Sequence, residues 1–115
     1  MEKKYSDDCI FCLIAAGKAP SKKIWENEDF LAIENKFPEA PIDILVMPKA
    51  HLEKSEARTS PDGYWDSFMK AIWEVVSAGG YDRTGYVLQN NGAGYNHLEH
   101  EHMHILSGMP KPTIG

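Results

Sequence analysis

The stretch HLEHEHMHIL, residues 97–106, contains four of the five histidines of the chain, and three of them fall on alternate positions. In a β-strand successive side chains point to opposite faces, so His100, His102 and His104 would share one face about 6.6 Å apart along the backbone. A helix would point side chains at this spacing away from one another. The two outer histidines would lie about 13 Å apart at the backbone, too far for all three to bind one tetrahedral zinc easily. The spacing therefore predicts a strand that carries a row of imidazoles.

Short apolar runs elsewhere in the chain predict the other strands of a sheet. Two of these runs flank the polar segment 27–29 and are typical of a hairpin, and a third is bounded by prolines, which suit strand starts and edges. A glycine-containing loop at 91–94 precedes the histidine strand. The predicted strands span residues 22–26, 30–35, 41–48, 85–90 and 98–106.

Two segments predict helices, one short and one long. Residues 9–16 form a short apolar segment that ends at Gly17. The long helix is expected to begin at Ser60, a good N-cap followed by Pro61, and to end at the two glycines at 79–80. Its apolar residues recur at three- and four-residue steps, and we expect this stripe to be ordinary core. Runs of strands with one main helix predict an α+β domain with an antiparallel sheet.

Composition limits the size and the partners of this protein. A chain of 115 residues with 43% hydrophobic residues is long enough for one domain, residues 1–115, with a real core. The net charge of −5 argues against a protein that binds nucleic-acid polymers, although single nucleotides remain possible partners. We find no apolar run of about 20 residues and no signal peptide, and therefore expect a cytoplasmic protein that does not enter a membrane.

The row of imidazoles has two interpretations. Clustered histidines on a strand can form a solvated edge. Alternatively, three titratable groups on one face can form a reactive site, because such groups are costly to align unless something uses them. One ring could attack as a nucleophile while the hydrogen bond of its other nitrogen keeps the attacking nitrogen unprotonated, and its neighbours could donate to developing negative charge. Phosphorus is the electrophile that suits such a row.

Residues 100–106, His-Glu-His-Met-His-Ile-Leu, resemble the signature of the histidine triad family, His-φ-His-φ-His-φ-φ with φ apolar. This family consists of nucleotide hydrolases and transferases. Further segments resemble family landmarks in the family's order and spacing, so that the resemblance covers nearly the whole chain; they are 8–12, 17–20, 40–41 and 45–51. The resemblance implies a five-stranded antiparallel sheet with one long and one short helix. It also implies a homodimer that binds a purine nucleotide with its α-phosphate beside the triad.

The resemblance also assigns roles to individual residues. His102 would be the nucleophile and form a covalent nucleotidyl-histidine that water then hydrolyses, while His100 and His104 would orient it and contact the phosphate. Asn35 stands where the family usually has an aspartate that bonds the ribose hydroxyls, and an amide can still make such bonds without the charge. Two further amides match polar positions near the phosphate or leaving group, and four apolar residues match the wall around the base or are plain core. They are Asn90, Asn96, Ile10, Phe11, Ile14 and Ile33.

Three residues besides Asn35 depart from the family pattern. Asp43 stands where a fourth histidine is common; its carboxylate could orient a triad imidazole and stabilise the imidazolium, or it could be a surface aspartate. Glu101 replaces an apolar residue on the face opposite the triad, where a carboxylate is costly unless it is paired or near the margin of the sheet. His97 replaces a small hydroxyl residue and could protonate a leaving group, or it could be a solvent-facing loop histidine.

The two cysteines form a Cys-x-x-Cys pair, Cys9 and Cys12, at a common spacing for zinc ligands. His51 and His100 are the candidates that would complete a structural zinc site, since some relatives bind zinc with the corresponding residues. His100 would then use one ring nitrogen for the metal and offer the other to the triad. Buried free thiols and a redox pair are the alternatives.

Three functions follow from these residues. The leading hypothesis is an enzyme that cleaves a substituent from the α-phosphate of a nucleoside monophosphate, with phosphoramidates, acyl-adenylates and dinucleoside polyphosphates as possible substrates. The second is a nucleotide-binding or nucleotide-sensing module that has lost efficient catalysis. The third is a purely structural zinc protein.

Overall fold

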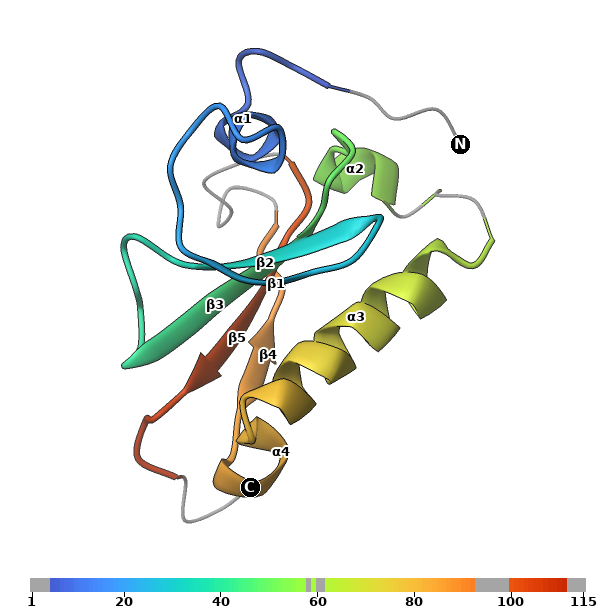
Figure 1. The fold of residues 1–115 in the computed structure, drawn as a ribbon. Coiled ribbons are helices and arrows are strands. Elements are labelled where there is room, and N and C mark those ends of the chain that lie inside the picture. The colour runs from blue at the N-terminus through green and yellow to red at the C-terminus, as the bar shows by residue number, and fades with distance from the viewer. Residues whose placement is uncertain (1–4, 58, 60–61, 93–99, 112–115) are drawn as a thin grey trace.

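The computed structural model is built on a single antiparallel sheet, with helices packed against both of its faces (Figure 1). The structure describes residues 5–57, 59, 62–92 and 100–111. The five strands lie in the order β1-β2-β3-β5-β4, and every neighbouring pair is antiparallel. The elements are α1 (Ile10–Ala15), β1 (Lys23–Glu26), β2 (Phe30–Glu34), β3 (Ile42–Pro48), α2 (Lys54–Ala57), α3 (Tyr64–Ala78), α4 (Tyr81–Thr84), β4 (Val87–Gln89) and β5 (Met103–Ser107). The predicted α+β class and five-stranded antiparallel sheet are confirmed.

Four details of the predicted elements are wrong. The long helix α3 begins after Gly63, whose positive φ of 89° marks the boundary, and not at Ser60; Ser60 and Pro61 themselves lie outside the described residues. The strand predicted at 85–90 is shorter, and α2 and α4, of four residues each, were not expected. The last strand begins at Met103 and not at 98. Just before it, His100 forms only an isolated bridge with Glu53.

The short helix α1 begins and ends for local reasons. Cys9 is its N-cap, and the cysteine sulfur accepts a hydrogen bond from the backbone N–H of Cys12. At the other end Gly17 adopts a φ of 76°, a left-handed conformation that glycine enters at little cost. The N–H of Gly17 then bonds the carbonyl of Ile14, and the N–H of Lys18 bonds that of Leu13, which is the Schellman pattern. The predicted glycine terminator is confirmed.

One face of the sheet carries the main apolar core. The long helix α3 lies along this face and contributes its apolar stripe, as predicted (Figure 1). Alternate residues of β2, β3 and β5 face it, because side chains of a strand point to opposite faces in turn. The buried residues of this cluster are Phe30, Ala32, Ile44, Val46, Phe68, Ala71, Ile72, Val75, Val76 and Ile105.

The opposite face of the sheet packs against α1. A second cluster of buried residues lies there and includes both cysteines: Cys9, Phe11, Cys12, Ile14, Leu31, Ile33, Leu45 and Met47. Asp43 precedes Leu45 by two residues in β3, and His104 pairs with Leu45 across the ladder, so both polar side chains belong to the α1 face. The sheet therefore separates a mainly apolar layer from a layer in which carboxylate, imidazole and thiol groups are buried.

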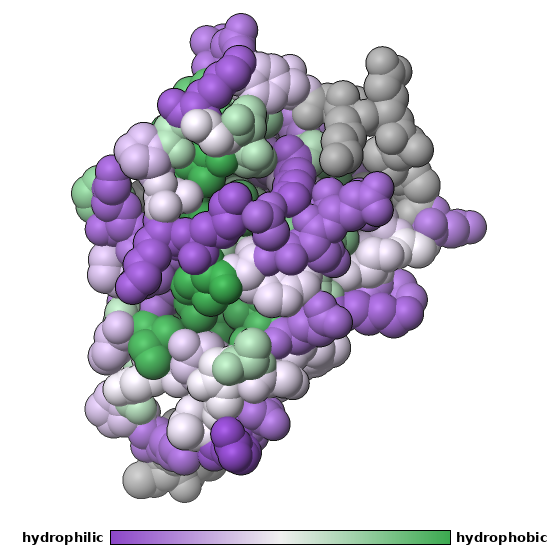
Figure 2. All heavy atoms as spheres, viewed as in Figure 1, coloured by the Kyte–Doolittle hydropathy of each residue, from purple (hydrophilic) through white to green (hydrophobic). Residues whose placement is uncertain are grey.

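The surface in the view of Figure 2 is mostly hydrophilic, with apolar groups exposed in separate small areas. The large apolar side chains with the most exposure are Phe37, at 80%, and Val87, at 47%. Among the described residues, no helix is both long enough and apolar enough to cross a membrane.

Candidate functional site

The register of β3 against β5 brings a carboxylate to the histidine row. Asp43 pairs with Leu106 and Leu45 pairs with His104, so Asp43 and His104 are diagonal neighbours on one face. The Nδ1–H of His104 donates to Asp43 Oδ1 at 3.0 Å. The Asp43 side chain is fully buried, so the interpretation of this residue as a surface aspartate is wrong. A buried carboxylate in this position can fix the tautomer of His104 and stabilise its imidazolium form.

Asp43 also holds the loop that follows β2. Its second oxygen, Oδ2, accepts hydrogen bonds from Asn35 Nδ2 and from the backbone N–H of Glu39, both at 3.0 Å. The side-chain oxygen of Asn35 in turn accepts from the N–H of Phe37. Asn35 was predicted to bond ribose hydroxyls, but its amide already bonds within the protein through both of its ends. One carboxylate thus connects His104 to the chain around 35–39.

The central histidine, His102, is held in the form that a nucleophile requires. Its Nδ1 lies 3.0 Å from the carbonyl oxygen of His100. A carbonyl can only accept, so Nδ1 carries the proton and Nε2 keeps its lone pair. Burial lowers the pKa of His102 below its ordinary value, with a smaller opposing effect from the bond to His100. The neutral imidazole is therefore favoured, and its ring centre lies 5.3 Å from that of His104.

His100 belongs to a different environment from the other two members of the row. Its Nε2–H donates to the carbonyl oxygen of Pro48 at 2.7 Å, and its Nδ1 faces the two cysteines. We had predicted that the second ring nitrogen of His100 would be offered to the triad, and this prediction is wrong, because that nitrogen bonds Pro48. The link runs instead through the His100 backbone carbonyl to His102. Phe11 packs edge-on against both rings, with centroid distances of 5.5 and 5.1 Å.

A cavity of about 710 Å³ opens beside His102 and His104. This volume lies in the range typical of small-molecule sites. The four residues predicted to form an apolar wall all line it, namely Ile10, Phe11, Ile14 and Ile33, and Asn35 lines it as well. Several lining residues had not been predicted, and they are Ala19, Pro20, Ser21, Lys22, Glu34, Lys36, Phe37, Glu39, Leu45 and Asn91. Ala19, Pro20 and Leu45 belong to segments that resemble family landmarks, and the sequence signal of the others is their closeness to predicted residues, since most belong to loops.

Asn90, which was predicted to face the nucleotide, turns away from this cavity. Its Nδ2 donates to Glu101 Oε1 and to the carbonyl oxygen of His102, each at 3.1 Å, and its Oδ1 accepts from Lys54 Nζ. The next residue, Asn91, is the one that lines the cavity. The other two predicted polar contacts, Asn96 and His97, lie outside the described residues.

Glu101 is buried and paired, which explains how a carboxylate is tolerated at this position. It is 1% exposed, and its Oε1 lies 2.8 Å from Lys54 Nζ of the short helix α2. The same oxygen accepts from the backbone N–H of His102 at 2.9 Å. A buried carboxylate is stable when it has a counter-ion and several donors, and Glu101 has both.

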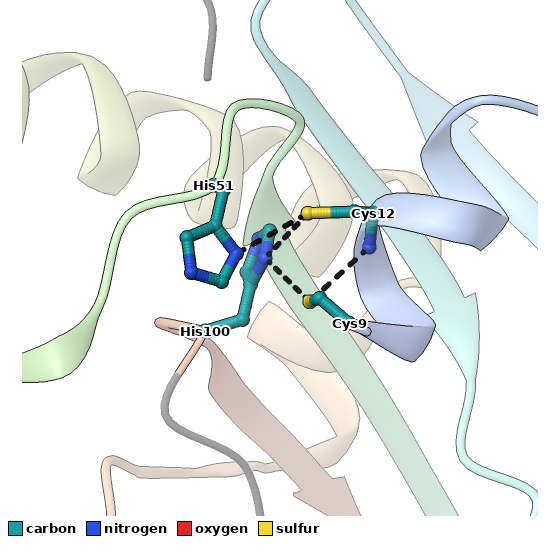
Figure 3. Close-up of side chains that lie close together, drawn as sticks. All are labelled: Cys9, Cys12, His51 and His100. Carbon is teal, nitrogen blue, oxygen red and sulfur yellow. Dashed lines mark hydrogen bonds between the residues drawn. The ribbon is translucent and has the colours of Figure 1, made fainter. Parts of the chain in front are cut away.

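Cys9, Cys12, His51 and His100 form the metal-ligand group that the sequence predicted (Figure 3). Cys9 Sγ lies 3.2 Å from His100 Nδ1, Cys12 Sγ lies 3.3 Å from His51 Nδ1, and Cys12 Sγ lies 3.6 Å from His100 Nδ1. A tetrahedral zinc places sulfur and nitrogen ligands about 3.6 Å apart. All four possible ligand atoms lie within 4.8 Å of one another. This group could therefore hold a metal ion.

The surroundings of these residues also suit a metal. The hydrogen bond from His100 Nε2–H to Pro48 leaves Nδ1 unprotonated toward the cysteines, and such second contacts orient metal-binding histidines. Burial lowers the pKa of His100 to about 4, which keeps the ring in its neutral, ligating form. Burial likewise raises the pKa of Cys12 to about 11, so a cation would be needed to stabilise its thiolate.

The fold and site together define a class of protein: a small α+β domain with a histidine row at a cavity and a Cys/His cluster behind it. Comparison with known proteins identifies the class. The family model of the HIT domain matches residues 16–111. The chain belongs to the HIT, or histidine triad, family.

Individual relatives support this assignment. A HIT-like protein of Chlamydia muridarum, itself uncharacterised, is 36% identical over 101 residues, which cover 86% of this chain and 80% of that protein. The structure of a histidine triad protein from Clostridium difficile has a TM-score of 0.82 and 36% identity, and the match covers 100% of both chains. A HIT family hydrolase from Clostridium thermocellum has a TM-score of 0.78 and 28% identity, over 95% of this chain and 98% of that one.

Proposed function

We propose that this protein is a nucleotide hydrolase or transferase that cleaves a substituent from the α-phosphate of a purine nucleoside monophosphate. The observation that carries the proposal is the state of His102. Its Nδ1–H is bonded to a backbone carbonyl, so the unprotonated Nε2 is the available nucleophile, and the residue lines a cavity of about 710 Å³. Nitrogen in this state attacks phosphorus readily.

The proposed reaction has two displacements at phosphorus. His102 Nε2 first bonds to the α-phosphorus while the bond from phosphorus to the substituent breaks, and the substituent leaves with a proton. Water then attacks the nucleotidyl-histidine, the phosphorus–nitrogen bond breaks, and the nucleoside monophosphate is released with His102 regenerated. His104, held by Asp43, would donate to the phosphate oxygens as negative charge develops. His97, outside the described residues, remains our candidate for protonating the leaving group.

The apolar wall of the cavity supports a purine as the base. Ile10, Phe11, Ile14 and Ile33 present side chains against which a flat aromatic ring could pack. Two lysines, Lys22 and Lys36, also line the cavity, although Lys22 is paired with Glu34. The wall fits a base, and the two histidines fit its phosphate.

The test is incubation with an adenosine phosphoramidate, comparing the native protein with His102→Ala. We expect the native protein to release adenosine monophosphate, and the variant to lose turnover on the order of 10⁴-fold while it still binds the nucleotide. A covalent adduct on His102 in quenched samples, detected by mass spectrometry, would identify the intermediate. Equal release by the two proteins would overturn the proposal. Binding without release by the native protein would favour a nucleotide-sensing module.

We also propose that the Cys/His cluster holds a structural zinc ion. Cys9, Cys12, His51 and His100 would supply two sulfur and two nitrogen ligands in a closed site, and the bound ion would stabilise the fold around α1. The expected result of elemental analysis on freshly purified protein is close to one equivalent of zinc. Less than about a tenth of an equivalent would reject the site.

The predicted homodimer and the cytoplasmic location remain predictions. Trp73 and Ile24 are each 43% exposed and are candidates for a subunit contact. Light scattering of the purified protein would measure its mass in solution directly, and a monomer at micromolar concentration would reject the predicted dimer.

A further inference from the structure

The backbone of His102 lies beyond the end of the edge strand β4. The edge strand β4 ends at Gln89, which pairs with His104, so its ladder stops short of His102. The backbone groups of His102 are nevertheless both bonded. Its N–H donates to Glu101 Oε1 at 2.9 Å, and its carbonyl accepts from Asn90 Nδ2 at 3.1 Å. Side chains therefore provide the hydrogen bonds that a longer β4 would have made.

The side chains that do this form one closed polar cluster, consisting of Lys54, Glu101 and Asn90. Glu101 Oε1 accepts from Lys54 Nζ at 2.8 Å and from Asn90 Nδ2 at 3.1 Å, and Lys54 also donates to Asn90 Oδ1. The Glu101 side chain is 1% exposed and that of Lys54 is 16% exposed. Lys54 comes from α2, so the cluster connects this helix to the end of β4 and to the start of β5.

Stability alone does not explain a buried ion pair at this place. Replacing such a pair with apolar residues of similar size is often neutral or stabilising, because removing two charges from water is costly. What an apolar pair cannot do is accept the hydrogen bond of the His102 N–H. The cluster therefore has a geometric consequence that hydrophobic packing would not reproduce.

The orientation of the His102 ring depends on this short piece of backbone. The ring bonds through Nδ1 to the carbonyl of His100, only two residues earlier, so ring and carbonyl are joined through residues 100–102 alone. A rotation of the peptide groups of this segment would turn the ring or break its bond to that carbonyl. On its other side the segment is held by the bond from the Glu101 N–H to the carbonyl of Leu52.

We propose that the Lys54–Glu101–Asn90 cluster is a positioning unit for His102, in which Glu101 and Asn90 replace the missing continuation of β4. The cluster fixes the backbone of residue 102 and thereby the direction of its imidazole. The expected effect of this cluster on turnover rests on the proposed function, in which His102 attacks phosphorus. Its expected effect on the backbone of His102 does not depend on that function.

The experiment compares a variant that removes the hydrogen-bond acceptor at residue 101 with a variant that keeps it. Lys54→Met with Glu101→Leu removes the ion pair together with the acceptor, and is expected to fold. Glu101→Gln removes the charge but keeps an oxygen that can accept from the His102 N–H. Asp66→Asn with Lys70→Met, at an exposed ion pair on α3, is the matched control. All proteins are loaded with zinc to the same stoichiometry before comparison.

Two measurements are made on each variant. In the variant with Lys54→Met and Glu101→Leu, hydrogen exchange of the His102 amide should accelerate at least about tenfold, while that of Ile105, in the middle of β5, stays unchanged. With adenosine phosphoramidate, its kcat should fall by about 10- to 100-fold with little change in KM. Glu101→Gln should recover most of both properties, and the α3 control should match the native protein.

Each result decides the proposal. A His102 amide that remains protected in the double variant overturns it, as does an unchanged kcat in an active enzyme. Loss of protection at both His102 and Ile105 would mean that the cluster supports the whole strand, which also overturns a positioning role. If the native protein proves no more active than His102→Ala, the proposed function fails, and amide exchange alone still decides whether the cluster holds His102.

Discussion

The two faces of the sheet are built from the same strands but differ in what they bury. The face under α3 buries one large cluster of apolar side chains, and its buried polar groups, such as the hydroxyl of Ser107, lie at the margin of that cluster. The face under α1 buries apolar residues together with Asp43, His102 and His104, and it borders the cysteines and His100. Alternation along each strand makes this division possible, because neighbouring residues point to opposite sides. One face can therefore be optimised for packing while the other carries groups that are costly to bury.

On the α1 face, specific hydrogen-bond partners offset the free-energy cost of burying polar groups. Asp43 has three donors, His102 has a carbonyl, and His100 has a carbonyl on one side and the cysteines on the other. Each buried polar group removed from water needs such a partner to avoid a penalty of about 1–3 kcal/mol. A change on this face should alter chemistry as well as stability, whereas a change to an apolar residue of the core under α3 should alter stability alone.

The largest effect should come from a matched pair of phenylalanines, one on each face. Phe68, on α3, and Phe11, on α1, are both buried. Truncation to alanine should lower the free energy of unfolding by about 3–5 kcal/mol in each case. Only Phe11→Ala should also reduce the turnover of folded protein, on the order of 10²-fold, because the Phe11 ring packs against His100 and His102 and lines the cavity.

Urea unfolding and kcat measured at low temperature, where both variants are folded, separate the two effects. Equal turnover for Phe68→Ala and Phe11→Ala would contradict the prediction that only the α1 face affects the chemistry. The same result would arise if Phe68→Ala disturbed the strands enough to move His104, and amide exchange across β5 would reveal that disturbance.

The second prediction concerns the metal-free protein in acid. Burial lowers the pKa of His100 to about 4, against about 6.5 for the unfolded chain. Between these values the unfolded chain binds a proton that the folded chain does not, so folding stability falls as the pH falls. The contribution, about 3 kcal/mol, should be complete above pH 6.5 and lost near pH 4.

The check is urea unfolding of chelator-treated protein at pH 7.5 and pH 4, for the native chain and for His100→Gln. The native chain should lose more stability between the two pH values than the variant does. An equal loss would show that His100 is not responsible. Zinc-loaded protein should lose additional stability in acid, because protons compete with the metal for the same ligands.

These predictions depend on contacts that the sequence revealed only in part. The alternation of histidines and the apolar runs were enough to predict the sheet, and Gly17 was enough to end α1. The Cys-x-x-Cys spacing of Cys9 and Cys12 is also local, but His51 and His100 are distant in sequence and were assigned to the cysteines only through the resemblance to the family. For the sheet, the end of α1 and the cysteine pair, the physical cause lies within a few residues of the pattern.

What the sequence did not reveal are partnerships between distant segments. Glu101 had no explanation until Lys54 appeared beside it, because α2 has four residues and is too short to leave a periodic pattern. The start of β5 at Met103 was missed for a related reason. The pattern of alternation continues through His100, but the strand that would pair with it on the β4 side ends earlier.

The third prediction tests whether Asp43 acts on turnover through His104. Asp43→Asn should lower kcat by about 10- to 100-fold with little change in nucleotide affinity. An amide can still accept from His104 Nδ1, but it lacks the charge that stabilises an imidazolium, and its own NH₂ group would face the donors Asn35 and Glu39. Asp66→Asn, on the exposed surface of α3, is the control. Equal turnover for native protein and Asp43→Asn would reject the orienting role.

The smallest effect should appear in the dependence of kcat/KM on pH, on its acid side. His102 must be neutral to attack, and burial lowers its pKa. The charges facing it act in both directions: His104 and Lys54 lower the pKa of His102, and Glu101 raises it, as does the bond to the His100 carbonyl. Since burial is the largest of these effects, kcat/KM should remain level as the pH falls through 6.5, the pKa of a free imidazole, and decline only below it.

The assignment of this decline, the acid limb of the profile, to His102 can be made by NMR titration of the imidazole C–H resonances. If the protonation of His102 controls the first displacement, the midpoint of its titration and the midpoint of the acid limb should agree in the free enzyme. A limb at or above pH 6.5 would mean that His102 is more hydrated than its position under α1 and beside Phe11 implies. The α1 face would then resemble an open surface more than the inner layer of the sheet, and its contrast with the α3 face would be correspondingly weaker.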